Sequence, residues 1–380
     1  MKIVCLPGIF PEYTIALANA LSKKEDVLLI LVNKKSAIKD HFKTIDKNVK
    51  VFLTREIKYP LWKHPENFLI YFDIIKKVNE FNPNIIHFQE CGSGQKSGTI
   101  YTVILSFLKK YSLVTTVHDT ALHPGHDKNL FTNMSRKYFT LPWLIRNSKQ
   151  FFVHGKRIKE SMVKKYKIPK NKIVVIPMAL HNFNPFRKYM KMKIKEERET
   201  VLLFGTIAMY KGIEYLIKAE PFISHEIPDV KIVIAGKPLN KANKKYFEEC
   251  KKLMVDRNRY EIYERFIDWK LGAKLMKRAS VVVLPCVEAS MSGVIPVAYA
   301  FKKSLVVTNV GSIPEIVDNG KTGLVVPPKN PEALAKAVVK LLKNKRLRHR
   351  MGRNGYKKLN TELSWDRVLD VLIRSYKKII

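Results

Sequence analysis

Residues 281–327 read VVVLPCVEASMSGVIPVAYAFKKSLVVTNVGSIPEIVDNGKTGLVVP, and this stretch decides the fold. It begins with an apolar run that is short enough to be a fully buried strand. A loop of small and polar residues leads to Gly293, after which Val294–Phe301 has the composition of a helix. Pro296 falls in the first turn of that helix, where proline is tolerated because the backbone N–H groups have no intrahelical acceptor. A second apolar run follows at Leu305–Val307, so the stretch predicts a strand–helix–strand unit of a parallel sheet.

Short apolar runs alternate with amphipathic stretches along the rest of the chain, which is typical of doubly wound α/β proteins. In the first half, the predicted strands are Lys2–Leu6, Val27–Val32, Asn84–Phe88, Leu113–Val117, Phe151–Val153 and Ile173–Ile176. In the second half, they are Val201–Phe204, Lys231–Ala235, Ser280–Leu284 and Leu305–Val307. The predicted helices are Pro11–Leu21, Glu66–Asn79, Gln95–Lys110, Ser135–Arg146, Lys156–Tyr166, Gly212–Ala219, Asn243–Met254, Gly272–Lys277, Val294–Phe301 and Pro331–Leu342.

The pattern breaks between His181 and Glu199, in a polar and basic segment that is typical of a domain linker. We therefore predict two α/β domains, residues 1–183 and 184–363, with a ligand-binding cleft at the carboxyl ends of their strands. The last stretch, 364–380, carries apolar residues on a helical period. Simple core packing would explain this pattern, as would a helix that crosses back to cover the first domain, which is the placement we expect.

The charge balance of the chain is unusual, with 70 Lys and Arg residues against 33 Asp and Glu residues and a formal net charge of +37. Such a charge predicts a positive potential over much of the surface. An anionic membrane surface would attract it, and a general bias in residue usage would explain it equally well. Nucleic acid is disfavoured as a partner because no helix-turn-helix, zinc finger or aromatic base-reading segment accompanies the charge.

Cysteine usage and hydropathy point to the cytoplasm. Cys5, Cys91, Cys250 and Cys286 are scattered without the spacing of a disulfide framework or a zinc site. The first residues lack the pattern of a signal peptide, and no apolar run approaches the length of a membrane span. We expect a cytoplasmic protein that is soluble or peripheral on the cytoplasmic face of the membrane.

The loop before the predicted helix Val294–Phe301 has the makings of an anion site. Free backbone N–H groups from about Ser292 to Ile295, together with the helix dipole, would suit a diphosphate, and Gly293 would let it approach the backbone. Any strand–loop–helix unit shares these features, so the loop alone would carry little weight.

A second loop strengthens this interpretation. The turn at Gly205 and Thr206 leads to Lys211 and Gly212, which places an ammonium group at the carboxyl end of a neighbouring strand. There it could neutralise a departing phosphate. The alternative is a solvated surface lysine, but the position of Lys211 between a glycine turn and Gly212 favours the functional interpretation.

These motifs, taken in order, resemble the retaining glycosyltransferases of family 4, which have the GT-B fold of two Rossmann-like domains facing each other across a cleft. The motifs cover the second half of the chain, so the resemblance is far more specific than a single glycine loop. They are Gly205 to Lys211-Gly212, Val233-Ile234-Ala235-Gly236, Glu288 to Ser292-Gly293-Val294-Ile295-Pro296, Val306-Val307-Thr308 to Gly311-Ser312-Ile313-Pro314-Glu315-Ile316-Val317, and Thr322-Gly323-Leu324.

The resemblance implies roles for individual positions. Lys211 matches the lysine that contacts the donor diphosphate, and Glu288 stands near the position of a catalytic glutamate. The backbone at Gly293, Val294 and Ile295 matches the amides that hold phosphate and sugar. The remaining donor-binding positions are Gly205, Thr206, Gly236, Ser292, Thr308, Gly311 and Glu315.

The chain also departs from the family pattern. The two glutamates that the family carries on either side of the glycine fall here on Ser290 and Ala298, and the arginine expected beside Gly205 is Thr206. Glu288 lies slightly earlier in the same loop and could replace the first glutamate. These departures keep a noncatalytic binding protein on a decayed scaffold as an alternative to an active transferase.

Polar residues follow the predicted strands of the first half. His118 and Asp119 come directly after Leu113–Val117, so an imidazole and a carboxylate would face the cleft and could hold the sugar or the acceptor. A His-Asp pair is often structural, but the family places a histidine after this strand. Further candidates for the acceptor side of the cleft are Gly8, Gly92, Gly94, His123 and His154.

The expected reaction transfers a hexosyl group from a UDP- or GDP-sugar to a glycan or a lipid-linked acceptor. Retention of configuration is implied by the resemblance alone. No Asp-x-Asp pair stands at a strand end, so we expect no metal and no cofactor. The basic first domain, with Trp62, Trp143 and the helix Ser135–Arg146, could rest on an anionic membrane, or this helix could simply be half-buried. A GT-B enzyme of other chemistry, such as an epimerase or a phosphorylase, remains an alternative.

Overall fold

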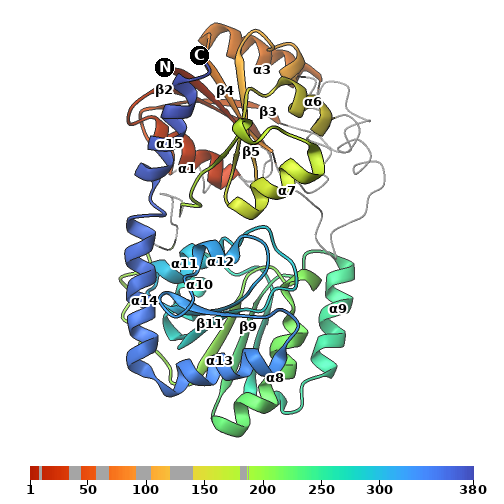
Figure 1. Ribbon diagram of the computed structural model, residues 1–380, viewed down its shortest axis with the longest axis vertical. Coiled ribbons are helices and arrows are strands. Elements are labelled where there is room, and N and C mark those ends of the chain that lie inside the picture. Colours follow the sequence, from red (N-terminus) through yellow and green to blue (C-terminus); the bar gives the residue numbers. More distant parts are fainter. Residues whose placement is uncertain are drawn as a thin grey trace.

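The computed structural model describes residues 1–7, 11–33, 44–56, 68–90, 104–119, 140–179, 186 and 188–380. Two α/β domains lie one above the other in Figure 1, and each is built on a parallel sheet. This arrangement confirms the predicted fold class.

The first domain has seven parallel strands in its described part, in the spatial order β3-β2-β1-β4-β5-β6-β7. The strands are β1 (Lys2–Leu6), β2 (Asp26–Asn33), β3 (Val49–Glu56), β4 (Ile85–Glu90), β5 (Ser112–Val117), β6 (Gln150–Val153) and β7 (Ile173–Val175). The helices around them are α1 (Pro11–Leu21), α3 (Phe68–Phe81), α6 (Leu141–Asn147) and α7 (Lys156–Tyr166).

The second domain has six parallel strands in the order β10-β9-β8-β11-β12-β13, all within the described residues. The strands are β8 (Thr200–Phe204), β9 (Lys231–Gly236), β10 (Tyr260–Glu264), β11 (Val281–Leu284), β12 (Ser304–Thr308) and β13 (Gly323–Val326). The helices are α8 (Ile213–Glu226), α9 (Lys241–Lys252), α10 (Trp269–Arg278), α11 (Val294–Ala300), α12 (Ile313–Ile316), α13 (Pro331–Lys343), α14 (Lys345–Asn360) and α15 (Trp365–Lys377).

The central strands are apolar at almost every position because both faces of each sheet are covered. In β8, Val201 and Leu203 belong to one buried cluster, whereas Leu202 belongs to the cluster on the opposite face. A strand covered on both sides reads as a continuous apolar run, which explains why the sequence predicted these strands correctly.

The apolar pattern did not predict several elements whose side chains are less buried or more basic. β3 and β10 lie at the edges of their sheets, and their side chains are mostly half-buried or exposed. β13, at the other edge of the second sheet, also has half-buried positions, and α14 is rich in basic residues. The predicted end of α8 at Ala219 was also wrong, because the helix continues through Pro221 to Glu226.

The last helix, α15, packs on the first domain although it follows the second (Figure 1). Val368 and Leu372 are fully buried in the cluster that includes residues of β1, β2 and α1. The hydroxyl of Tyr376 is hydrogen-bonded to Nδ1 of His87, and Lys149 Nζ donates to the carbonyl of Ile379 at 2.8 Å. The chain therefore passes between the domains at two points of the sequence.

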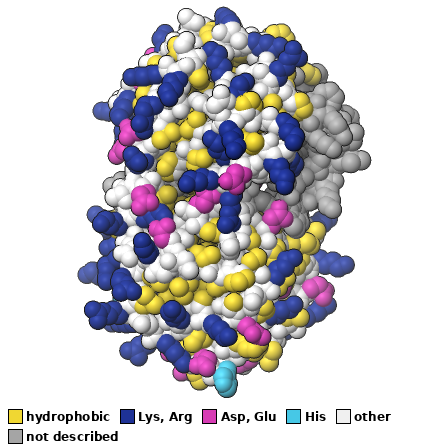
Figure 2. Space-filling view, viewed as in Figure 1, with side chains coloured by type: hydrophobic (Ala, Val, Ile, Leu, Met, Phe, Trp, Pro, Cys, Tyr) yellow, Lys and Arg dark blue, Asp and Glu magenta, His cyan; other side chains and the backbone are white. Residues whose placement is uncertain are grey.

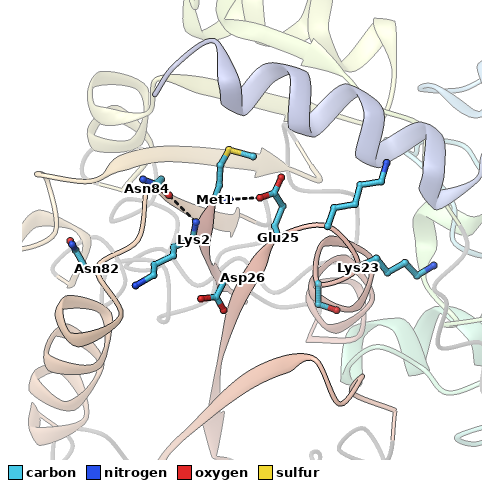
Figure 3. Close-up of a pocket in the computed structure, with 9 residues that line it drawn as sticks. Met1, Lys2, Lys23, Glu25, Asp26, Asn82 and Asn84 are labelled. Carbon is cyan, nitrogen blue, oxygen red and sulfur yellow. Dashed lines mark hydrogen bonds and ion pairs between the residues drawn. The ribbon is translucent and has the colours of Figure 1, made fainter.

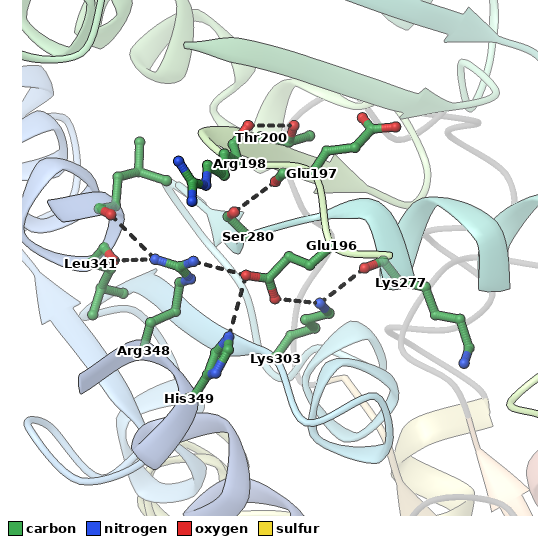
Figure 4. A network of polar contacts seen from close by, with 11 residues as sticks. Glu196, Glu197, Arg198, Thr200, Lys277, Ser280, Lys303, Leu341, Arg348 and His349 are labelled. Carbon is green, nitrogen blue, oxygen red and sulfur yellow. Dashed lines mark hydrogen bonds and ion pairs between the residues drawn. The ribbon is translucent and has the colours of Figure 1, made fainter. Parts of the chain in front are cut away.

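The segment that enters the second domain is held by a buried ionic network (Figure 4). The Glu196 carboxylate accepts from Lys303 Nζ at 2.9 Å and from Arg348 Nη2 at 2.8 Å, and both basic side chains are buried. Burial alone would raise the pKa of Glu196, but Lys303 and Arg348 outweigh it and lower that pKa. Because Glu197 also pairs with Arg278 at 2.7 Å, this segment is part of the second domain's structure.

No helix in the described part of the chain is both long enough and apolar enough to span a membrane.

Candidate active site

The first loop of the second domain is shaped by two glycines. Gly205 follows β8 with a φ of +116°, a left-handed conformation that glycine adopts without strain. A Cβ at Gly236, at the end of β9, would lie only 1.8 Å from the Gly205 carbonyl oxygen. The local backbone geometry therefore requires both glycines. Thr206, which follows Gly205, is exposed.

Lys211 ends the 3-10 turn Met209–Lys211 and is followed by Gly212, whose φ is +64°. A Cβ on Gly212 would lie 2.2 Å from the Pro285 carbonyl oxygen, so this loop lies directly against the loop that follows β11. The contact is reinforced by the Val287 N–H, which donates to the Tyr210 carbonyl at 2.9 Å. The sequence motif around Lys211 thus places the lysine beside the candidate donor loop.

The charge on Lys211 is stabilised by its surroundings. Burial alone would lower its pKa, but electrostatic interactions with Cys286, Tyr210 and Asp119 outweigh burial and raise it. The ammonium also lies 5.0 Å from the centroid of the Tyr210 ring. Asp119 belongs to the first domain, so the structure brings two predicted catalytic residues from opposite domains into electrostatic range.

The donor loop between β11 and α11 is held by hydrogen bonds and close contacts from the end of β12 and the turn that follows it. The hydroxyl of Thr308 donates to the Cys286 carbonyl at 2.5 Å, and the Ser312 N–H donates to the Ser290 carbonyl at 3.0 Å. Gly311, with a φ of +49°, lies so close that a Cβ would be 1.6 Å from the Ala289 carbonyl oxygen. Thr308 and Gly311 therefore position the loop.

Gly293 differs from the other glycines of the site. Its backbone is helical, with a φ of −64°, and the nearest atom to a Cβ at this position would be Met178 Cε, at 4.0 Å. Among the residues that the structure describes, neither strain nor crowding requires glycine here. Those residues leave space at this position for a ligand.

The backbone around Gly293 leaves fewer free N–H groups than expected. The Ile295 N–H donates to the Ser292 carbonyl at 3.3 Å, so the prediction that this group is free was wrong. Among the described residues, no acceptor is found for the N–H groups of Ser292, Gly293 and Val294, nor for the buried Ser292 hydroxyl.

Replacing Gly293 by alanine should separate ligand binding from folding. We expect the melting temperature of the Gly293→Ala variant to be unchanged, because the added methyl group meets open space. The dissociation constant for a nucleoside diphosphate should rise about tenfold, since the methyl group would hold the phosphate away from the backbone. Calorimetry and thermal unfolding measure both quantities, and unchanged nucleotide affinity would rule out this role for Gly293.

Two further positions of the loop are now located. Glu288 is half-buried in the part of the donor loop that contacts the Lys211 loop, where its N–H lies 3.5 Å from the Tyr210 carbonyl. Ala298 is fully buried in the apolar core of the second domain. A glutamate at that position would lie in the apolar core and could not face the cleft.

In the first domain, His118 and His154 lie together at the carboxyl ends of β5 and β6, with their ring centroids 5.1 Å apart. The Tyr13 ring of α1 contacts both edge-on, at 5.0 Å from His118 and 5.3 Å from His154. Trp365, at the start of α15, closes the group at 5.5 Å from Tyr13. Sequence reasoning found the two histidines but missed the two aromatic residues that hold them.

Gln89, the penultimate residue of β4, was also missed. Its side-chain oxygen lies 3.0 Å from Nε2 of His118, so the two side chains are hydrogen-bonded. Gln89 thereby orients the ring of His118. β4 also carries the polar residues His87 and Glu90, so no local signal in the sequence singled out Gln89.

The remaining predicted residues of the first domain, Gly8, Gly92, Gly94 and His123, lie outside the described residues, as does Trp62. Trp143 is half-buried against the apolar cluster formed by α3 and α6.

Two buried histidines should make the first domain sensitive to acid. Burial lowers the pKa of His154 from 6.5 to about 4, and burial followed by repulsion from His154 lowers that of His87 to about 3. In the unfolded chain both imidazoles bind a proton near pH 6.5, whereas the folded chain binds them only at lower pH. Stability is therefore complete above pH 6.5 and decreases as the pH falls towards 4, by up to roughly 3 kcal/mol for His154.

Urea unfolding across this pH range measures the effect, and the His154→Gln variant is the comparison. Its free energy of unfolding should depend less steeply on pH than that of the unmodified protein. Equal slopes would show that His154 is not the titrating group.

The two domains meet directly at Glu315, for which the resemblance implied a role in the nucleotide pocket. In the structure, its carboxylate accepts from the backbone N–H groups of Lys156 at 2.6 Å and Arg157 at 2.9 Å, at the start of α7. The Arg157 guanidinium donates in turn to Asn309 Oδ1 and to the Gly311 carbonyl, both at 3.0 Å. Both oxygens of Glu315 are thus engaged by the first domain.

Other surface features lie away from this site. A hollow of about 760 Å³ opens at the amino ends of β1 and β2, where the Lys2 N–H donates to Asn84 Oδ1 at 2.8 Å (Figure 3). Lys and Arg side chains spread over both domains, and several Asp and Glu side chains lie where the domains meet (Figure 2). No group of three or more metal-ligating side chains is found in the part of the chain that the structure describes.

The fold and the site define a class of protein: two Rossmann-like domains face each other, with a lysine and a glycine loop on one side and a pair of histidines on the other. Residues 12–180 match the model of the Glycosyltransferase Family 4 domain, and residues 187–358 match that of the Glycosyl transferases group 1 domain. The protein is a glycosyltransferase with the GT-B fold, and the two matches make it one of the family 4 type.

Individual relatives agree with this assignment. The chain is 28% identical over 287 residues to an uncharacterized glycosyltransferase of Methanocaldococcus jannaschii, covering 72% of this chain and 71% of the relative. It is 24% identical over 305 residues to the alpha-D-kanosaminyltransferase of Streptomyces kanamyceticus, covering 77% of each. Anabaena HepE in complex with UDP-glucose superposes over 100% of both chains with a TM-score of 0.72 at 16% sequence identity, which shows the shared fold.

Proposed function

We propose that the protein transfers a hexosyl group from a UDP- or GDP-sugar to a glycan or a lipid-linked acceptor, with retention of configuration and without an obligatory metal. The observation that carries this proposal is the pairing of Lys211, whose positive charge is stabilised, with the donor loop at Gly293, where the chain leaves open space. A charged lysine and unpaired backbone N–H groups can together neutralise a departing diphosphate.

Each part of the site has a task in this reaction. Lys211 and the N–H groups around Gly293 bind the diphosphate of the donor, and Glu288 lies close enough to their loop to orient the sugar. His118, oriented by Gln89 at the carboxyl end of β5, contacts the sugar or the acceptor hydroxyl. Because Anabaena HepE binds UDP-glucose and shares the fold, UDP-sugars are the first donors to test.

We also propose that the acceptor is reached at an anionic membrane surface by the first domain. Phe72 on α3 and Phe107 are each 68% exposed. Their sequence neighbours Tyr71 and Leu108 belong to the same apolar cluster as Trp143. Exposed aromatic side chains on a strongly basic protein suit the interface of an anionic bilayer. Co-sedimentation with anionic and with neutral vesicles tests this part, and equal binding to both would contradict it.

The donor is identified by offering the purified protein UDP-, GDP- and ADP-sugars and measuring nucleotide release together with thermal stabilisation. We expect one nucleotide class to stabilise the protein and to be released only when an acceptor is present. Activity that survives chelation of divalent cations supports metal independence, and the anomeric signal of the product in NMR reports retention or inversion.

The alternatives give different results in the same assay. An epimerase would convert the nucleotide sugar without an acceptor, and a phosphorylase would require inorganic phosphate. A decayed binding protein would show no turnover, and failure to bind any nucleoside diphosphate would contradict the proposed function altogether.

A further inference from the structure

Helix α7 of the first domain begins without a cap of its own. Its N-cap residue is Gly155, which has no side chain to accept a hydrogen bond, and its first turn contains Lys156 and Arg157. Basic residues are unfavourable at this end of a helix because the dipole is positive there. The missing acceptor and the missing negative charge are both supplied by Glu315 of the second domain.

Gly155 is a glycine only because the second domain lies against it. Its φ of −178° is an extended conformation that any residue adopts, so the first domain alone does not require glycine. A Cβ at this position would lie 2.1 Å from Oγ and 2.3 Å from Cβ of Ser312. Ser312 is fully buried, and its N–H is bonded to the donor loop at Ser290, so it cannot move aside easily.

The contact joins the two halves of the candidate site. On one side, Gly155 directly follows His154, which contacts Tyr13 and His118. On the other side, Ser312 and Glu315 belong to the turn and helix that follow Gly311, the residue that supports the donor loop. A shift at this contact would move the candidate acceptor residues relative to the donor loop.

We propose that Glu315, the start of α7 and the Gly155–Ser312 contact form an interdomain latch that holds the domains closed and sets the distance between donor and acceptor. Glu315 is a positioning residue here, because it acts through the helix it caps. The catalytic consequence rests on the proposed function, whereas the closure itself does not.

Adding a side chain at the contact between the domains tests the latch. In the Gly155→Ala variant the new methyl group would collide with Ser312, so the domains should separate. We expect a larger radius of gyration in solution X-ray scattering and a kcat lowered about tenfold or more, since closure completes the site. The dissociation constant for UDP should change by less than roughly threefold, because the residues proposed to bind it lie in the second domain.

A second substitution should reverse the first. Replacing Ser312 by glycine removes both atoms that the new methyl group meets, leaving Glu315 Oε1 at 3.2 Å as the next contact. The Gly155→Ala/Ser312→Gly variant should therefore regain the compact scattering profile and most of the kcat. Ser312→Gly alone, at a φ of −93° that needs no glycine, is the matched control.

The cap is tested separately by hydrogen exchange. The amides of Lys156 and Arg157 should exchange about tenfold or more faster in Glu315→Ala than in the unmodified protein, because both lose their acceptor. Glu226→Gln is the control, since Glu226 pairs with Lys343 on the outer surface of the second domain.

The proposal is overturned if Gly155→Ala keeps the scattering profile of the unmodified protein, or if Ser312→Gly fails to reverse its effects. The second outcome would mean that the first domain itself needs the glycine. X-ray scattering and hydrogen exchange require no sugar donor. They therefore test whether the latch holds the domains closed even if the protein transfers a different group. Altered scattering with unchanged turnover would show a contact without influence on the reaction, and would refute the positioning role.

Discussion

Replacing Lys211 by methionine is expected to lower kcat/KM by about 10²–10³-fold while the protein remains folded. Methionine keeps much of the length and apolar character of the side chain but removes the ammonium group. Electrostatic interactions with Cys286, Tyr210 and Asp119 raise the pKa of that group, so it stays charged where we propose that the diphosphate binds. Its loss should be felt most where negative charge develops on the leaving group, and therefore in kcat as well as in nucleotide affinity.

Lys218 provides a matched control on the same domain. It is exposed on α8, and its ammonium lies over the ring of Tyr215 at 5.7 Å, much as Lys211 lies over Tyr210 at 5.0 Å. Lys218→Met removes the same charge and a similar ring contact, and should leave kcat/KM unchanged. Equal losses in the two variants would show that overall charge, and not the position of Lys211, governs activity.

The second large effect is expected at Gly311. In Gly311→Ala the new Cβ would lie 1.6 Å from the Ala289 carbonyl oxygen and 2.9 Å from that of Ser290, at a φ of +49°. Both obstacles are backbone atoms of the donor loop, so the loop has to move. We expect a loss of about 4 kcal/mol or more in the free energy of unfolding, together with loss of nucleotide binding.

Gly320 separates backbone strain from collision. It also has a positive φ, of +78°, but a Cβ there would meet no atom within 4 Å. Gly320→Ala should therefore cost only about 1–2 kcal/mol, the usual penalty of the left-handed conformation, and should leave nucleotide binding intact. Chemical unfolding and calorimetry measure both quantities. If Gly311→Ala proves as mild as Gly320→Ala, the 309–312 turn does not support the donor loop.

The glycines of the candidate donor site show which structural roles a sequence motif can predict. Their positions in the chain pointed correctly to tight loops at strand ends, because glycine is required where two backbones approach. The motif treated them alike, however. Only the structure separates Gly212 and Gly311, which are crowded by carbonyl oxygens, from Gly293, which faces open space.

In the first domain, the sequence predicted only part of the candidate site. His118 and His154 could be picked out because each follows an apolar strand, but Tyr13, Gln89 and Trp365 carry no such local mark. Tyr13 and Gln89 reach the histidines from α1 and β4, and Trp365 contacts Tyr13 from α15, so these residues come from elements far apart in the sequence. Contacts of this kind depend on how the helices pack over the sheet, and a single sequence contains no period or spacing that reports it.

The sequence by itself determined that the chain forms two parallel α/β units with tight glycine loops at strand ends, because buried strands and tight turns are encoded by local apolar runs and glycines. The helical period of the last stretch also predicted that α15 returns to the first domain, as it does. The tertiary structure alone decided that Glu315, placed in the nucleotide pocket by its motif, caps α7 across the domain boundary. The physical reason is that this outcome depends on which surfaces remain unsatisfied after each domain has folded. For α7 these are two free N–H groups beside two basic residues.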